Sequence, residues 1–248
     1  MSAITQSSNP ALNSNIFEKA AVENTGESMT IQGTMNKTFI MLLLALVTGS
    51  FTWTQFFAGA NVTLYLYGGL FGGLVVALIT VFSPKNSPYT APLYAALEGL
   101  FLGAISAIYG AAYDGIVMQA VLLTVGVFLM MLYLYRSGTI QVTDRLRTGI
   151  VAATGGIALL YLLTWVLSFF GLAVPLIHQN GLIGIGFSLI VVGVAAFNLL
   201  LDFDFIKKAS DQGAPKYMEW YGAFGLMVTL VWLYIEMLRL LSKLQSRN

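Results

Sequence analysis

The sequence predicts an all-α integral membrane protein with seven membrane-spanning helices. Of its 248 residues 57% are hydrophobic and 9% are charged, and the mean hydropathy is +0.79. A soluble domain is roughly 25% charged, so this composition indicates a protein that crosses a bilayer several times. The apolar runs are continuous and lack the alternation of membrane β-strands, which leaves helices as the predicted spanning elements.

Seven apolar runs are long enough to cross a bilayer, because a hydrocarbon core of about 30 Å needs about 20 helical residues. Short connections between them predict antiparallel neighbours in one compact bundle. The runs cover about residues 38–58, 61–82, 90–111, 115–135, 149–170, 181–203 and 218–241.

The chain divides into a tail and a membrane domain. Residues 1–36 are rich in Ser, Asn and Thr and lack the basic start and apolar core of a signal peptide. We therefore predict a polar, partly disordered tail over 1–36 and a seven-helix domain over 37–245. Two pairs of glycines within the runs, Gly69 with Gly73 and Gly99 with Gly103, have the small-xxx-small spacing that favours close helix packing.

The basic residues predict the orientation in the membrane. The connections opposite the N-terminal side contain no Lys or Arg, so the positive-inside rule places the N-terminus in the cytoplasm, in a cell (inner or plasma) membrane. An odd number of crossings then puts Arg239, Lys243 and Arg247 outside, which makes the C-terminal end either an exception or a re-entrant segment. Seven full crossings are the favoured interpretation. The residues on the cytoplasmic side are Lys37, Lys85, Arg136, Arg145, Arg147, Lys207, Lys208 and Lys216.

Several classes of function are disfavoured by the sequence. The absence of cysteine excludes disulfides, thiolate metal sites and thiol catalysis. No HExxH, GxSxG or Walker motif is present, so neither an enzyme nor a bound cofactor is expected. A formal net charge of +1 gives no basic footprint for nucleic acid. The one histidine, His178, lies in a polar connection and is interpreted as a solvated loop residue.

The few carboxylates inside the apolar runs are the candidate functional residues. Glu98 lies within the third run, Asp202 and Asp204 close the sixth, and Glu219 opens the seventh. An ionisable group in a bilayer costs several kcal/mol and is seldom present without a task. Asp204 and Glu219 are equally consistent with solvated interfacial positions.

Glu98 and Asp202 are too deep for that explanation. Carboxylates so placed could exchange protons, or bind a hard cation such as calcium transiently through oxygen ligands. Asn198, one helical turn before Asp202, is a plausible additional ligand. Glu236 and Arg239, three residues apart on one helical face, are more consistent with a structural ion pair than with a transport path.

The combination of motifs resembles the Bax inhibitor-1 family of membrane proteins, specifically its bacterial members. Each motif is weak alone, and the resemblance covers about residues 36–245. The motifs are Ser8-Asn-Pro-Ala-Leu12 and Asn36-Lys-Thr38 near the start, Leu97-Glu-Gly-Leu100, Asp202-Phe-Asp-Phe-Ile206, Gly213-Ala-Pro-Lys-Tyr-Met-Glu-Trp220 and Glu236-Met-Leu-Arg-Leu-Leu241.

The resemblance implies six helices around a central C-terminal seventh helix and a pH-sensitive calcium leak. In that family an acidic residue ending the sixth helix, matched by Asp202, pairs with an acidic residue in the seventh. Here the second position falls around Met227 to Thr229 and is not ionisable, so Glu98 is the substitute partner to test. A basic latch after the second helix is matched by Lys85.

A second hypothesis belongs to another class. Some bacterial relatives are linked to a membrane-bound protease, so the chain could be an interaction protein that modulates a protease or a stress response without conducting ions. The polar tail would then be its contact surface. The expected partners are the lipid bilayer and either calcium or other cations, or a membrane protease.

Overall fold

The computed structural model describes residues 26–171 and 181–246; His178 and residues 1–25 of the predicted tail lie outside them. The described chain forms seven helices that are long and apolar enough to cross a bilayer, as the sequence predicted. They are α2 (Ile31–Phe57), α3 (Thr63–Phe82), α4 (Ser87–Ala112), α5 (Ile116–Arg136), α6 (Asp144–Phe169), α8 (Leu182–Asp211) and α9 (Met218–Gln245), with a 3-10 turn η1 (Pro84–Asn86) before α4.

Two helices, α2 and α6, begin well before their apolar runs, and each start is capped by a side chain. Thr30 caps α2 by accepting a hydrogen bond from Gly33 N at 2.9 Å, so the predicted domain boundary between residues 36 and 37 falls inside a helix. Thr143 caps α6 in the same way through Leu146 N. Both hydroxyls satisfy backbone donors that a helix start leaves unpaired. Arg147 therefore lies in α6 and not in the connection before it.

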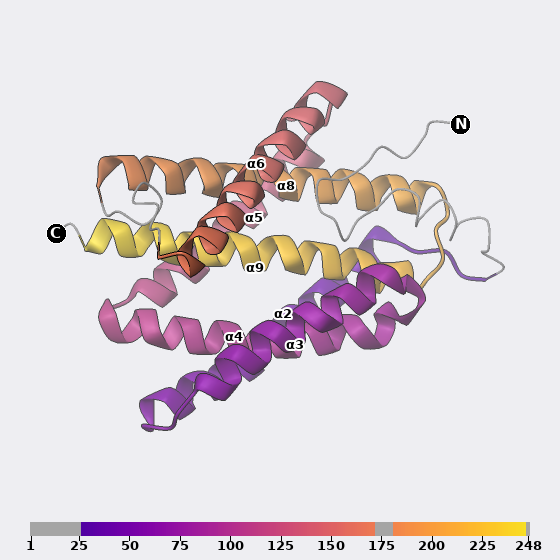
Figure 1. The fold of residues 1–248 in the computed structure, drawn as a ribbon. Coiled ribbons are helices and arrows are strands. Elements are labelled where there is room, and N and C mark those ends of the chain that lie inside the picture. Colours follow the sequence, from indigo (N-terminus) through magenta and orange to yellow (C-terminus); the bar gives the residue numbers. More distant parts are fainter. Residues whose placement is uncertain (1–25, 172–180, 247–248) are drawn as a thin grey trace.

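The C-terminal helix α9 is central, and 72% of its 18-residue apolar stretch is buried. It packs against α2, α4, α5 and α8, while α3 packs against α4 and α6 against α8 (Figure 1). The ends at which α2, α4, α6 and α9 begin gather at one side of the bundle, called here the basic end. There residues 26–30 lie against the α8–α9 turn, where Met29 N donates to Ala214 O at 2.7 Å.

Backbone contact joins α2, α3 and α4. A Cβ built on Gly69 of α3 would lie 2.6 Å from Leu97 O of α4. A Cβ on Gly103 of α4 would lie 2.7 Å from the Cα of Gly49 on α2. Real side chains do not approach so closely, so these helix pairs require glycine. The small-xxx-small pairs thus mark tight packing.

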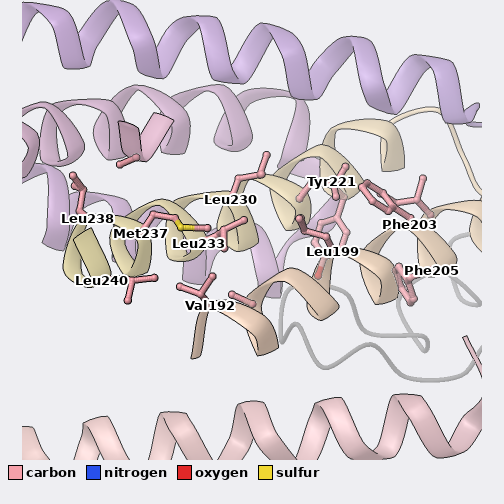
Figure 2. Close-up of a cluster of buried hydrophobic side chains, with 14 of the residues drawn as sticks. Val192, Leu199, Phe203, Phe205, Tyr221, Leu230, Leu233, Met237, Leu238 and Leu240 are labelled. Carbon is pink, nitrogen blue, oxygen red and sulfur yellow. The ribbon is translucent and has the colours of Figure 1, made fainter. Parts of the chain in front are cut away.

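Two apolar clusters lie on different faces of α9. Leu226, Leu230 and Leu233 belong to the cluster shared with α5 and α8, which Figure 2 shows between α8 and α9. Phe224, Met227 and Val231 belong to the cluster shared with α2, α3 and α4. At 100° per residue the centres of the two sets lie about 125° apart around the helix axis. Side chains on these two faces are therefore separated by the central helix.

Candidate functional site

Asp202 lies on α8 against the central helix and is 0% exposed. Its Oδ2 accepts a hydrogen bond of 2.5 Å from the hydroxyl of Thr229 on α9. That hydroxyl also lies 3.4 Å from Gly225 O, one turn earlier in α9. Thr229 falls in the Met227–Thr229 stretch where the family resemblance placed an acidic partner. The structure therefore puts a neutral hydroxyl against the buried carboxylate.

Asp204 is buried and paired, so of the two interpretations left open the solvated one is wrong. Its Oδ2 lies 2.7 Å from Arg147 Nη2 of α6 and 2.8 Å from Lys208 Nζ of its own helix. Asp204 thus links α6 and α8 near the basic end.

Glu98 is buried on the other side of the bundle. Its Oε1 would lie 2.9 Å from a Cβ built on Gly73, so the carboxylate is directed at α3, and Tyr94 lies one turn earlier on the same helix. The Tyr94 ring packs edge-on against Phe224, with 4.9 Å between centroids. Phe224 and Thr229 lie about 140° apart around the axis of α9. Glu98 is thus not placed as the partner of Asp202, because the central helix lies between them.

The three proposed calcium ligands are directed to different helices. The amide nitrogen of Asn198 donates to Thr154 Oγ1 of α6 at 2.8 Å and to Val194 O at 2.8 Å. Asp202 is directed at α9 and Glu98 at α3. Among the described residues no group of three or more His, Cys, Asp or Glu side chains is arranged to hold a metal ion. The geometry gives no support for a preformed site of these three residues.

Glu219 is fully buried at the start of α9, so the solvated interpretation is wrong for this residue too. It forms an ion pair with Lys37 of α2, and its Oε1 accepts hydrogen bonds from Thr30 N at 2.8 Å and Thr30 Oγ1 at 3.0 Å. Lys216 lies 3.3 Å from the same oxygen. This pairing could not be predicted from the sequence, because Lys37 and Glu219 are 182 residues apart.

Lys85 is exposed in η1 at the basic end. Two residues later, Ser87 Oγ donates a hydrogen bond of 3.0 Å to Tyr217 O, just before α9. The turn that carries the candidate latch is therefore attached to the start of the central helix.

A second charged cluster occupies the opposite end of α9. Arg239 Nη1 lies 2.7 Å from Glu236 Oε1, so these two residues form an ion pair. Tyr161 of α6 joins it: its hydroxyl donates to Glu236 Oε1 at 3.0 Å and accepts from Arg239 Nη1 at 2.7 Å. The role of Tyr161 was missed from the sequence.

Lys243 is buried near the same end of α9. Its Nζ donates to Gly184 O at 3.0 Å and Ser188 Oγ at 2.9 Å, both on α8. Two of the basic residues that seemed to violate the positive-inside rule thus have partners inside the bundle. With α9 continuous over 28 residues, a full crossing is favoured over a re-entrant segment.

The seven membrane-spanning helices agree with the comparison to known families. A sequence model of the family described as Bax inhibitor 1 like matches residues 9–246, nearly the whole chain. The chain belongs to this family. No curated protein and no solved structure matches it. In this Bax inhibitor-1-like protein, the partner that the structure gives to the buried Asp202 carboxylate is the Thr229 hydroxyl.

Proposed function

We propose that this protein is a pH-modulated leak channel for calcium or other cations in the cell membrane, with its N-terminus in the cytoplasm. This function requires neither a catalytic residue nor a cofactor. The observation that supports it most is a fully buried carboxylate, Asp202, hydrogen-bonded to the central helix of a membrane bundle. A charge at such depth is costly and indicates a functional role.

The proton on Asp202 would control how strongly α8 holds α9. A charged Asp202 accepts a charge-assisted hydrogen bond from Thr229, and such bonds are stronger than neutral ones. After protonation the pair is neutral and the contact weakens by about 1 kcal/mol. A difference of that size changes the ratio of two conformers about fivefold. We therefore expect the leak to increase as the pH falls.

Other charged residues at the basic end would set the closed state. Lys85 is the candidate latch, because its turn is bonded to the start of α9 through Ser87 and Tyr217. Asp204 would act with Asp202 from a position two residues later on α8, and its ion pair with Arg147 attaches the end of α8 to α6. Glu98 would influence conduction from the α3–α4 side, independently of Asp202.

The test is calcium flux into proteoliposomes containing a calcium-sensitive dye, measured from about pH 6 to pH 8. The wild type should leak more at the acidic end, and Asp202→Asn should lose most of the pH dependence. Asp211→Asn is the matched control, because Asp211 lies on the same helix but is exposed, and among the described residues its ion-pair partner is Lys207 in the i,i+4 position. An Asp202→Asn profile identical to that of the wild type would contradict the gating role.

An interaction protein that modulates a membrane-bound protease is the second candidate, favoured by one observation. Residues 26–30 are fixed against the α8–α9 turn, so a partner bound to the preceding tail would be coupled to this turn. Deletion of residues 1–25 spares Thr30, which caps α2 and binds Glu219. If the shortened protein loses its function in the cell but its ion flux is unchanged, this candidate is favoured over the leak.

A further inference from the structure

Helix α6 presents a polar stripe to the rest of the bundle. Arg147, Thr154 and Tyr161 are spaced by seven residues, so they lie on one face with a drift of about 20° per step. The fourteen residues from the first to the third cover about 21 Å, most of a hydrocarbon core of about 30 Å.

Each member of the stripe bonds to a polar side chain on α8 or α9. We call this interface the polar seam. Its contacts are Arg147 Nη2 to Asp204 Oδ2 at 2.7 Å, Asn198 Nδ2 to Thr154 Oγ1 at 2.8 Å and Tyr161 OH to Glu236 Oε1 at 3.0 Å.

Apolar contact adds little to the seam. Besides Arg147, the buried residues of α6 are Ile150 and Ile157, which lie between the polar levels. Large side chains such as Leu159 and Leu163, 61% and 57% exposed, face outward. In a bilayer such surfaces contact lipid whether α6 is docked or not, so lipid supplies no hydrophobic force that drives docking. The attachment of α6 therefore depends mainly on polar contacts: the Arg147–Asp204 ion pair, and hydrogen bonds worth about 0.6 kcal/mol each on average in membranes.

Both ends of the seam contain a buried polar atom that lacks a hydrogen-bond partner among the described residues: Arg147 Nη1 and Glu236 Oε2. The two side chains are 8% and 2% exposed. An unsatisfied buried donor or acceptor costs about 1–3 kcal/mol, and more when it is charged. Water that enters the seam would satisfy both atoms, so hydration offsets part of the cost of separating α6.

We propose that α6 is a lateral gate: it separates from α8 and α9 along the polar seam and admits water between them. This inference concerns the attachment of one helix and goes beyond the proposed leak. It stands or fails whether or not the chain conducts ions.

The absence of cysteine allows spin labels to be placed directly. Labels at Leu159→Cys on α6 and Ile190→Cys on α8 measure the distance between the two helices that meet at the seam. Both positions are more than half exposed. Labels at Phe39→Cys on α2 and Leu93→Cys on α4 measure the distance between the two helices that are packed through glycines. Pulsed electron paramagnetic resonance in lipid nanodiscs gives both distance distributions. A separate label at Ile157→Cys measures how accessible the seam is to a water-soluble relaxation agent.

The seam is weakened by Thr154→Val together with Tyr161→Phe, which remove two hydroxyls and keep the side-chain shapes. The control is Thr164→Val, because the Thr164 hydroxyl bonds only to Leu160 O of its own helix among the described contacts. Size-exclusion profiles and circular dichroism confirm that each variant is folded.

The double variant should add a longer-distance population to the α6–α8 pair and leave the α2–α4 pair unchanged. Accessibility at residue 157 should rise severalfold, and the Thr164→Val control should match the wild type in both measurements. An α6–α8 distribution as narrow in the double variant as in the wild type would overturn the proposal. Separation without a rise in accessibility would also overturn it, because the gate would then not admit water.

Discussion

The two sides of α9 are held together by different forces. On one side α2 and α4 share the most extensive interface in the described bundle, and it depends on backbone contact between Gly49 and Gly103. On the other side α6 has a small interface with α8 and is attached through the polar seam. Asp202 lies between α8 and α9, on the side that includes the seam.

The difference shows how one membrane protein can combine a fixed half with a changeable half. Close backbone packing permits a single geometry, because a small shift loses many van der Waals contacts together. Polar contacts between side chains can break one at a time, and water or a proton can replace the lost partner. A proton-controlled contact is therefore better placed on the α8–α9 side.

The largest expected effect comes from a substitution in the glycine contact between α2 and α4. Gly103→Val should destabilise the fold by about 3 kcal/mol, because its Cβ would overlap the backbone of Gly49. Unfolding by denaturant in mixed micelles measures the change. The control is Gly156→Val on α6, where a Cβ meets nothing within 4 Å and little change is expected. Equal stability of the two variants would remove the contrast between the two halves.

A smaller effect is expected at the strongest contact of the seam. Arg147→Gln should cost about 2 kcal/mol, because it leaves Asp204 with Lys208 as its remaining ion-pair partner. The exposed neighbour Arg145 provides the control, and Arg145→Gln should change the free energy of unfolding by less than about 0.5 kcal/mol. If both variants unfold at the same denaturant concentration, the Arg147–Asp204 pair does not attach α6.

The smallest effect concerns the other end of the seam. Tyr161→Phe should cost about 1 kcal/mol, because it removes a hydroxyl that bonds to both Glu236 and Arg239. Tyr133→Phe, at a residue that is 66% exposed on α5, serves as the control in the same unfolding assay. A cost as large as that of Gly103→Val would mean that the seam is as rigid as the glycine interface.

Much of the fold could be predicted from the sequence, because a bilayer requires long apolar helices. All seven spans were located, although α2 begins at Ile31 and α8 extends to Asp211, beyond their apolar runs. The spacing of Gly69 with Gly73 and Gly99 with Gly103 indicated tight packing, which the close approaches of Gly69 and Gly103 show. The three-residue spacing of Glu236 and Arg239 placed them on one face.

The partners of the buried carboxylates could not be predicted in the same way. Asp202 bonds to a threonine, a residue type that occurs throughout the spans, and Glu219 pairs with Lys37 across most of the chain. Such contacts depend on how the helices are rotated against each other, which hydropathy does not specify. One signal was available and missed: the seven-residue repeat of Arg147, Thr154 and Tyr161.

The central claim is that the contact between Asp202 and Thr229 controls the leak, and substitutions at residue 229 test it most directly. Calcium flux into proteoliposomes is measured against pH for the wild type and for Thr229→Asp. In the wild type, flux should rise as the pH falls, because protonation weakens the hold of Asp202 on α9. In Thr229→Asp two adjacent carboxylates can share one proton, and loss of that proton makes them repel, so flux should instead rise as the pH increases. The opposite slopes would support the account, and identical pH profiles would contradict it.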